Sequence, residues 1–160
     1  MELQRLLDRS AASAGSFLKQ TFELPGHDLT APQLTRYFEE RVRAVAIATV
    51  TAKGAPRVSP VGAVFHRTKF HVPTAEYSMR VRHLRKRPAI SLTHFELNVI
   101  AVIVHGGAEI ISPGMPEFEE LEISEEERHA LCAKGQGVYL KIEPERMFAW
   151  AKDPGQFSEV

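Results

Sequence analysis

The feature that most constrains the fold is a series of short, β-branched segments separated by turn residues. The segments read AVAIATVT, RVSPVGAVF, KFHVPT, AISLTHF and VIAVIVHGGAEII, and the turns include AKGAP, HRT and ELN. Runs of this length with turn chemistry between them are typical of antiparallel strands. GVYLKIEPERMFAW predicts one or two more. About six short strands, with helices only before, between and after them, indicate an α+β fold around a small antiparallel barrel.

Helices are predicted on both sides of this series. Residues 1–20 carry apolar side chains at helical spacing, and residues 30–42 begin with Thr30 and Gln33 at the spacing of a capping box. The acidic segment MPEFEELEISEEERHALCAKG predicts a helix that stops near Gly135, with Ser124 and Glu127 placed to cap a second short helix.

The charges are balanced overall but unevenly distributed. The chain has 20 Lys and Arg against 20 Asp and Glu, so it has no global attraction for nucleic acid or acidic lipid. Residues 41–90 nevertheless carry 11 basic residues against one acid, Glu76, whereas residues 91–160 carry 5 against 13. This split predicts either a site for an anionic ligand or two oppositely charged surfaces that meet.

The single cysteine, Cys132, excludes a disulfide within the chain and is typical of a reducing compartment. The first residues contain no apolar signal segment, and no apolar run reaches the length of a membrane span. We therefore expect a cytoplasmic protein with no membrane partner.

The segment TAEYSMRVRHLRKRP carries the strongest functional signal. Ser78 is a good helix N-cap, and Pro88 ends the helix. Met79, His83 and Leu84 are predicted to face the core. Arg80 lies in the first turn, where the helix dipole disfavours a cation unless an anion is bound there. Exposed N–H groups, hydroxyls of Ser78 and of Thr74 on the preceding strand, and this arginine together would make a phosphate cradle. The basic residues that follow, Arg82, Arg85, Lys86 and Arg87, are predicted to form a solvated surface.

The preceding strand is unusual because Pro60 removes a backbone donor and Gly62 removes a side chain. Both residues suit a strand whose backbone lies against a flat ligand. An edge strand with a bulge is the alternative, and the residues alone do not decide between the two.

These segments, in this order and with these gaps, resemble the split-barrel flavoproteins related to pyridoxamine 5′-phosphate oxidase, from about Leu29 to Trp150. The resemblance implies a six- to seven-stranded antiparallel split β-barrel with flanking helices, covering residues 29–160 as a cofactor-binding domain. Residues 1–28 would be an N-terminal, helical extension. It also implies a homodimer with the cofactor at the interface and a two-electron reduction of a small organic substrate. The cofactor would be FMN or coenzyme F420, with FMN preferred.

The resemblance also implies roles for particular residues. Three residues of one strand would line the flat ring of the cofactor, partly through backbone atoms: Ser59, Pro60 and Val61. Thr74, Ser78 and Arg80 would bind its phosphate beside the backbone of Met79, where relatives commonly have a basic residue. Trp150 would form a wall of the pocket. The chain lacks the C-terminal Trp/Arg/His/Arg substrate motif of the true oxidases, so vitamin B6 oxidation is not expected.

The sequence contains no motif typical of a metal site, a catalytic nucleophile or a nucleotide-binding loop. The seven histidines show no metal-ligand spacing, and neither a nucleophile elbow nor a phosphate-binding glycine loop is present. No catalytic acid or base can be named, which leaves open a non-catalytic carrier of the cofactor or of haem. The basic helix lacks interleaved aromatic residues, so nucleic acid is not an expected partner.

Overall fold

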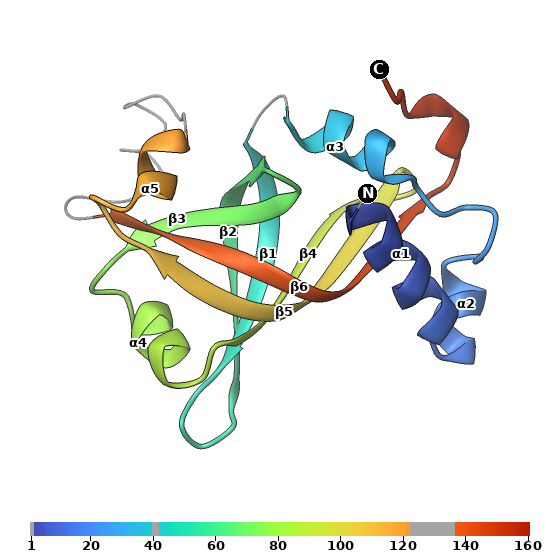
Figure 1. Ribbon diagram of the computed structural model, residues 1–160. Coiled ribbons are helices and arrows are strands. Elements are labelled where there is room, and N and C mark those ends of the chain that lie inside the picture. The colour runs from blue at the N-terminus through green and yellow to red at the C-terminus, as the bar shows by residue number, and fades with distance from the viewer. Residues whose placement is uncertain (1, 40–41, 122–136) are drawn as a thin grey trace.

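The computed structural model describes residues 2–39, 42–121 and 137–160, and its strands close into an antiparallel barrel in the order β1-β2-β3-β6-β5-β4 (Figure 1). This confirms the predicted fold class. The strands are β1 Arg43–Val50, β2 Pro56–His66, β3 Lys69–Ala75, β4 Ala89–Glu96, β5 Ile100–Ile111 and β6 Gly137–Ala151. The helices are α1 Glu2–Ser13, α2 Ser16–Thr21, α3 Ala31–Glu39, α4 Met79–Lys86 and α5 Pro116–Glu120, followed by the 3₁₀ turn η1 Pro154–Gln156.

Alternation along the strands places one set of side chains inside the barrel. Val45 and Ile47 of β1 are buried, while Ala46 between them faces outward. Because successive side chains of a strand point to opposite faces, the strands that pair with β1 follow the same alternation. The inward residues of the other strands complete one core with them, among them Leu92, Val102, Val104, Leu140 and Ile142.

The N-terminal helices pack on the barrel. Leu3, Leu6 and Leu7 of α1 join the barrel core, and Ser10 Oγ accepts a 2.9 Å hydrogen bond from the backbone N–H of Met147. The helix expected over residues 1–20 is divided into α1 and α2 at Gly15. Phe17, expected on the apolar stripe, is consequently 80 % exposed.

Two local features shape the sheet. Arg67 and Thr68 form the turn between β2 and β3 and both have positive φ, +49° and +65°. On β5 the register shifts between His105 and Gly106, where two adjacent glycines stand within the strand, a pattern typical of a bulge. A Cβ on Gly106 would lie 2.0 Å from the carbonyl oxygen of Glu143, so the strands approach too closely there for any side chain.

The predicted acidic helix is described only in part. α5 accounts for its first residues, and the remainder, including Ser124, Glu127, Cys132 and Gly135, lies outside the described residues. Within residues 2–39, 42–121 and 137–160, no helix combines the length and apolar character needed to cross a membrane.

Candidate functional site

The end of β3 and the start of α4 bring three of the predicted site residues together. Thr74 is buried, and its Oγ1 lies 3.5 Å from Ser78 Oγ and 3.5 Å from a terminal guanidinium nitrogen of Arg80. β3 stays paired with β6 through Ala75, so the threonine is fixed by the sheet. The two hydroxyls and the guanidinium therefore form one polar cluster, which we call the cradle.

The first turn of α4 adds backbone donors to the cradle. Ser78 has extended backbone angles, and its hydroxyl accepts from the N–H of Val81 at 3.4 Å, as expected of an N-cap. In the part of the chain that the structure describes, the N–H groups of Met79 and Arg80 have no acceptor. Free N–H groups at a helix start form an anion site together with the helix dipole.

Arg80 is the electrostatic centre of this cluster. Its side chain is partly buried, and burial lowers the pKa of its guanidinium. Among the described residues, no carboxylate lies within ion-pair distance of it, whereas Arg85 on the same helix pairs with Glu76 at 3.4 Å. A cation partly removed from water and left without a counter-charge is costly, and a bound anion would remove that cost.

The strand that carries Ser59, Pro60 and Val61 has an open edge beside the cradle. β2 pairs with β1 from Pro56 to Ala63, and with β3 only from Val64 to His66. Beyond that point β3 continues on β6 alone, up to Thr74 and Ala75. The barrel is thus split between β2 and the part of β3 that leads into the cradle.

The position of Pro60 follows from this split. His66 and Lys69 flank the two-residue turn between β2 and β3, and such flanking residues bond each other through both their backbone N–H and C=O groups. Backbone groups alternate in direction along a strand, so every second residue of β2 before His66 also points its N–H and C=O toward the β3 side. Pro60 belongs to that set, and its missing N–H costs no bond to β1. The alternative of an edge strand with a bulge is therefore right in one part only. β2 is an edge strand on the side that faces β3, but its pairing with β1 contains no bulge.

The side chains on this edge point in two directions. Ser59 and Val61 pair with the inward residues Ile47 and Val45 of β1, so they face the barrel interior. Pro60 pairs with Ala46 and faces outward. Only backbone atoms of these residues reach the open edge.

Two expectations about neighbouring side chains are corrected. Val81 and Leu84 are the buried residues of α4, whereas Met79 is 60 % exposed and His83 is half-buried. α4 turns to the core the face that carries Val81 and Leu84, three residues apart, and Met79 lies off that face. Trp150 does not join the cradle: it lies at the other end of β6 from Val138, the partner of Thr74, and it packs against Phe22. Its role at a cofactor stays a prediction.

Sequence reasoning missed an outward surface without charge. β1, β2 and β4 lie side by side, and their outward residues form what we call the uncharged face: Ala44, Ala46, Ala48, Val58, Pro60, Gly62, Ser91, Thr93 and Phe95. Val58 and Phe95 are 72 % and 65 % exposed. The signal was present as alternate small residues in AVAIATV, but alternation alone does not say which set faces water.

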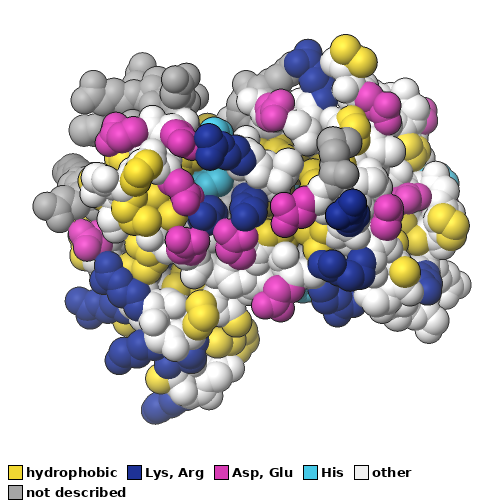
Figure 2. Space-filling view, viewed as in Figure 1, with side chains coloured by type: hydrophobic (Ala, Val, Ile, Leu, Met, Phe, Trp, Pro, Cys, Tyr) yellow, Lys and Arg dark blue, Asp and Glu magenta, His cyan; other side chains and the backbone are white. Residues whose placement is uncertain are grey.

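A second missed feature is a polar cavity of about 190 Å³ between β3, β6 and α5. Figure 2 shows histidine, basic and acidic side chains gathered over this part of the molecule. Lys141 bonds Glu117 at 2.9 Å and Glu109 at 3.0 Å. Burial alone would lower the pKa of Lys141, but these bonds outweigh it and hold that pKa above its usual value. In the described residues no group of three or more His, Cys, Asp or Glu could hold a metal ion.

The chain is similar in structure to several known proteins. No curated protein matches the sequence. Three of the solved structures similar to it are an FMN-binding protein related to pyridoxamine 5′-phosphate oxidase from Nostoc punctiforme, an F420 reductase and the haem storage protein HutZ from Vibrio cholerae. Their TM-scores are 0.55, 0.53 and 0.59, at 14 %, 16 % and 18 % identity. The alignments cover 67 %, 70 % and 75 % of this chain and 74 %, 94 % and 94 % of theirs.

At these identities the structural likeness shows a shared fold. The family is shown by the sequence itself, because the model of pyridoxamine 5′-phosphate oxidase matches residues 31–151 of the 160. That range contains the whole barrel, the cradle and the open edge of β2. The chain therefore belongs to the pyridoxamine 5′-phosphate oxidase family.

Proposed function

We propose that this chain is an FMN- or coenzyme F420-dependent oxidoreductase, with FMN preferred, that reduces a small organic substrate by transfer of two electrons as hydride. The observation that carries the proposal is Arg80, a partly buried cation with no carboxylate among the described residues, placed beside two hydroxyls and two free N–H groups. The phosphate group of either cofactor supplies the missing negative charge, and its oxygens can accept from these donors.

The residues divide the work of holding such a cofactor. Thr74, Ser78 and Arg80 would bind its phosphate, and the open edge of β2 would offer backbone groups near Pro60 and Gly62 to the polar edge of its ring. The bound cofactor would supply the redox chemistry. The protein contributes binding, orientation and shielding from water.

The uncharged face supports a homodimer with the cofactor at its interface. The outward side of β5 and β6 is covered by the chain's own N-terminal region, where Phe22 and Leu18 pack against Phe148 and Trp150. The uncharged face has no such cover from the described residues, and it includes Pro60 beside the open edge of β2. A second copy on this face would bury apolar surface and enclose the ring of a bound cofactor.

The test is a parallel titration of the apo-protein with FMN, coenzyme F420 and haem, repeated with Arg80→Ala. Loss of one charge-assisted contact should weaken binding of the phosphate-bearing cofactor by about ten- to a hundredfold. Arg82→Ala is the matched control, because Arg82 is exposed on the same helix and should change the affinity little. Equal affinity of Arg80→Ala and wild type would show that the cradle is not the phosphate site.

A non-catalytic carrier of the cofactor or of haem is the second candidate. It is favoured by the absence of any titratable side chain from Val58 to Gly62, the strand segment beside the open edge, and by the likeness to a haem storage protein. Steady-state turnover with quinone, flavin or dye acceptors separates the two functions. Tight binding without turnover would support the carrier, whereas turnover would support the reductase. Neither function includes oxidation of pyridoxamine 5′-phosphate.

A further inference from the structure

We propose that a second cavity, between α1, α3, the β2–β3 turn and the C-terminal segment, binds a small organic amine in its protonated form. This cavity is separate from the cradle, and none of its lining residues belongs to the cofactor site proposed above. The proposal therefore stands or falls independently of the proposed oxidoreductase.

The cavity has the size and the fixed walls of a small-molecule site. Its volume is about 550 Å³, within the usual range for such pockets. Gln4 Oε1 accepts from the backbone N–H of Ala31 at 2.9 Å and so ties α1 to α3. Gln33 Nε2 donates to the carbonyl oxygens of Pro154 and Phe157, which holds the C-terminal segment against α3. These bonds fix the elements that form the walls.

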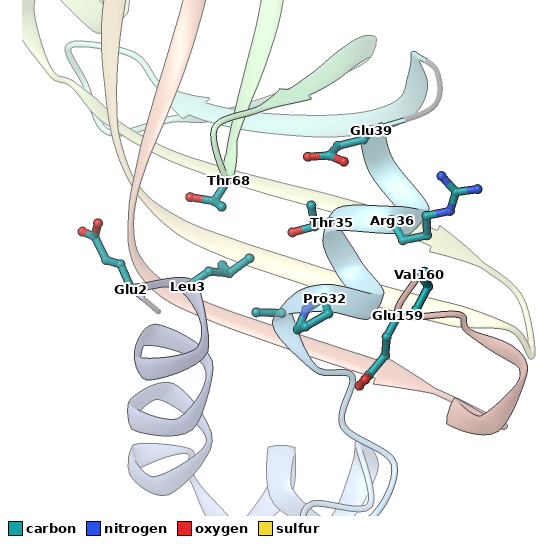
Figure 3. A pocket seen from close by; sticks show the side chains of 10 residues that line it. Glu2, Leu3, Pro32, Thr35, Arg36, Glu39, Thr68, Glu159 and Val160 are labelled. Carbon is teal, nitrogen blue, oxygen red and sulfur yellow. The ribbon is translucent and has the colours of Figure 1, made fainter.

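One end of the cavity is apolar and the other is polar. Leu3 and Ala31 are buried and form the apolar end with Pro32. Figure 3 shows the Glu39 carboxylate and the Thr35 and Thr68 hydroxyls on one side of the cavity. Thr35 and Glu39 are one turn apart on α3, which places them on the same helix face.

The charges at the rim favour a cation. Among the described lining residues, three glutamates, Glu2, Glu39 and Glu159, stand against one base, Arg36. Figure 3 shows the Arg36 side chain turned away from the hydroxyls of Thr35 and Thr68. Glu159 accepts from Thr30 Oγ1 at 3.0 Å. Glu39 has no ion pair or hydrogen bond to any residue that the structure describes. Its carboxylate is therefore available to a ligand.

The ligand class follows from these two ends. A primary ammonium group has three donors and no acceptor, which matches one carboxylate and two hydroxyl oxygens. An aryl or alkyl body of modest size would occupy the apolar end. Thr68 is the second residue of the two-residue turn between β2 and β3, where a positive φ is required, and its side chain lines the cavity.

The experiment measures binding of phenethylammonium to the isotope-labelled protein by NMR titration, with 2-phenylethanol and 3-phenylpropionate as neutral and anionic counterparts. We expect the ammonium to bind at least tenfold more tightly than either, with shifts concentrated in α1, α3 and the β2–β3 turn. Equal binding of the ammonium and the alcohol would overturn the proposal. Shifts centred on Ser78 and Arg80 would overturn it as well.

Two variants locate the charge. Glu39→Gln should weaken phenethylammonium binding about tenfold while leaving cofactor affinity and the melting temperature unchanged. Glu119→Gln, an exposed glutamate of α5 outside the cavity, should bind like wild type. Unchanged binding in Glu39→Gln would contradict the proposal. Because Arg80→Ala tests the cradle alone, failure of the proposed function is distinguishable from failure of this site.

Discussion

At the scale of single residues, the site rests on a cation in an unfavourable place. A helix start carries partial positive charge, so Arg80 adds like charge to the dipole, and partial burial adds a desolvation cost. The fold holds the guanidinium in this place, because Arg80 donates to Thr74 and the Ser78 cap fixes the first turn of α4. A bound anion would offset the electrostatic cost. Affinity for a phosphate should therefore respond directly to charge added to or removed from this turn.

Adding a base at position 79 is the simplest such change. Met79 is 60 % exposed and lies next to Arg80 in the first helical turn. Met79→Lys should tighten binding of a phosphate-bearing cofactor by about three- to tenfold and steepen its salt dependence. The apo-protein should be slightly less stable, because the added cation opposes the helix dipole. Fluorescence titration at two salt concentrations measures the gain, and Gln156→Lys, exposed and remote, controls for net charge. A gain equal in both variants would remove position 79 from the site.

His71 predicts how stability depends on pH. It is 2 % exposed, and burial lowers its pKa from 6.5 to about 4. Between these values the unfolded chain binds a proton that the folded protein does not. Stability is therefore full above pH 6.5 and falls as the pH drops toward 4, by up to about 1.4 kcal/mol per pH unit. Burial also lowers the pKa of His94, so that residue acts in the same direction.

Urea unfolding at several pH values between 4 and 7 measures this slope. His71→Gln removes one of the two histidines that are buried in the described part of the chain, and it should flatten the curve in that range. His105→Gln removes an exposed histidine and is the control. If His71→Gln loses stability on acidification as steeply as wild type, His71 is not buried in its neutral form.

At the scale of elements, the sequence predicted the strands better than their contacts. Turn chemistry and β-branched runs are local, so the six strands and the irregularity at Gly106 could be recognised from the residues themselves. The separation of β2 from β3 was indicated only by Pro60, which suited a ligand-facing strand equally well, and no residue showed that pairing with β3 stops at Val64. The cradle was predicted because Thr74, Ser78 and Arg80 lie within seven consecutive residues. The cavity between α1, α3, the β2–β3 turn and the C-terminal segment was not, because its lining residues lie far apart in the sequence.

The two glycines of β5 offer a sharp test of the bulge. A Cβ on Gly106 would meet the carbonyl oxygen of Glu143 at 2.0 Å, whereas the nearest atom to a Cβ on Gly107 is the Pro88 oxygen at 3.9 Å. Gly106→Ala should therefore cost about 3 kcal/mol or more, since two backbones must move apart. Gly107→Ala should stay within about 1 kcal/mol of wild type. Thermal unfolding of both variants checks this, and similar melting temperatures would mean that β5 and β6 separate easily at the bulge.

At the scale of the whole molecule, part of the uneven charge distribution is explained by ion pairs within the chain. Ion pairs join the basic middle of the chain to its acidic last part: Lys69 to Glu143 at 2.7 Å, and Arg67 to Glu120 at 3.2 Å. Exposed pairs of this kind add little stability, so their main effect is to neutralise the surface around the barrel. Arg80 is partly buried and has no such partner among the described residues, and the uncharged face carries no Lys, Arg, Asp or Glu. The molecule thus combines a partly buried cation that lacks a counter-charge with an uncharged face.

An uncharged, partly apolar face of this kind predicts that the protein forms a dimer through it. Ala46 lies centrally on the uncharged face, paired with Pro60 on one side and Thr93 on the other. We expect wild type to sediment as a dimer and Ala46→Glu as a monomer with a similar melting temperature, since the new carboxylate points outward. Ala12→Glu, exposed on α1, should remain dimeric.

If the cofactor lies at the interface, Ala46→Glu should also weaken its binding, because the second chain no longer covers the ring. A monomeric wild type would contradict the dimer, whereas a monomeric Ala46→Glu with full cofactor affinity would place the cofactor within one chain, on the cradle and the open edge of β2 alone.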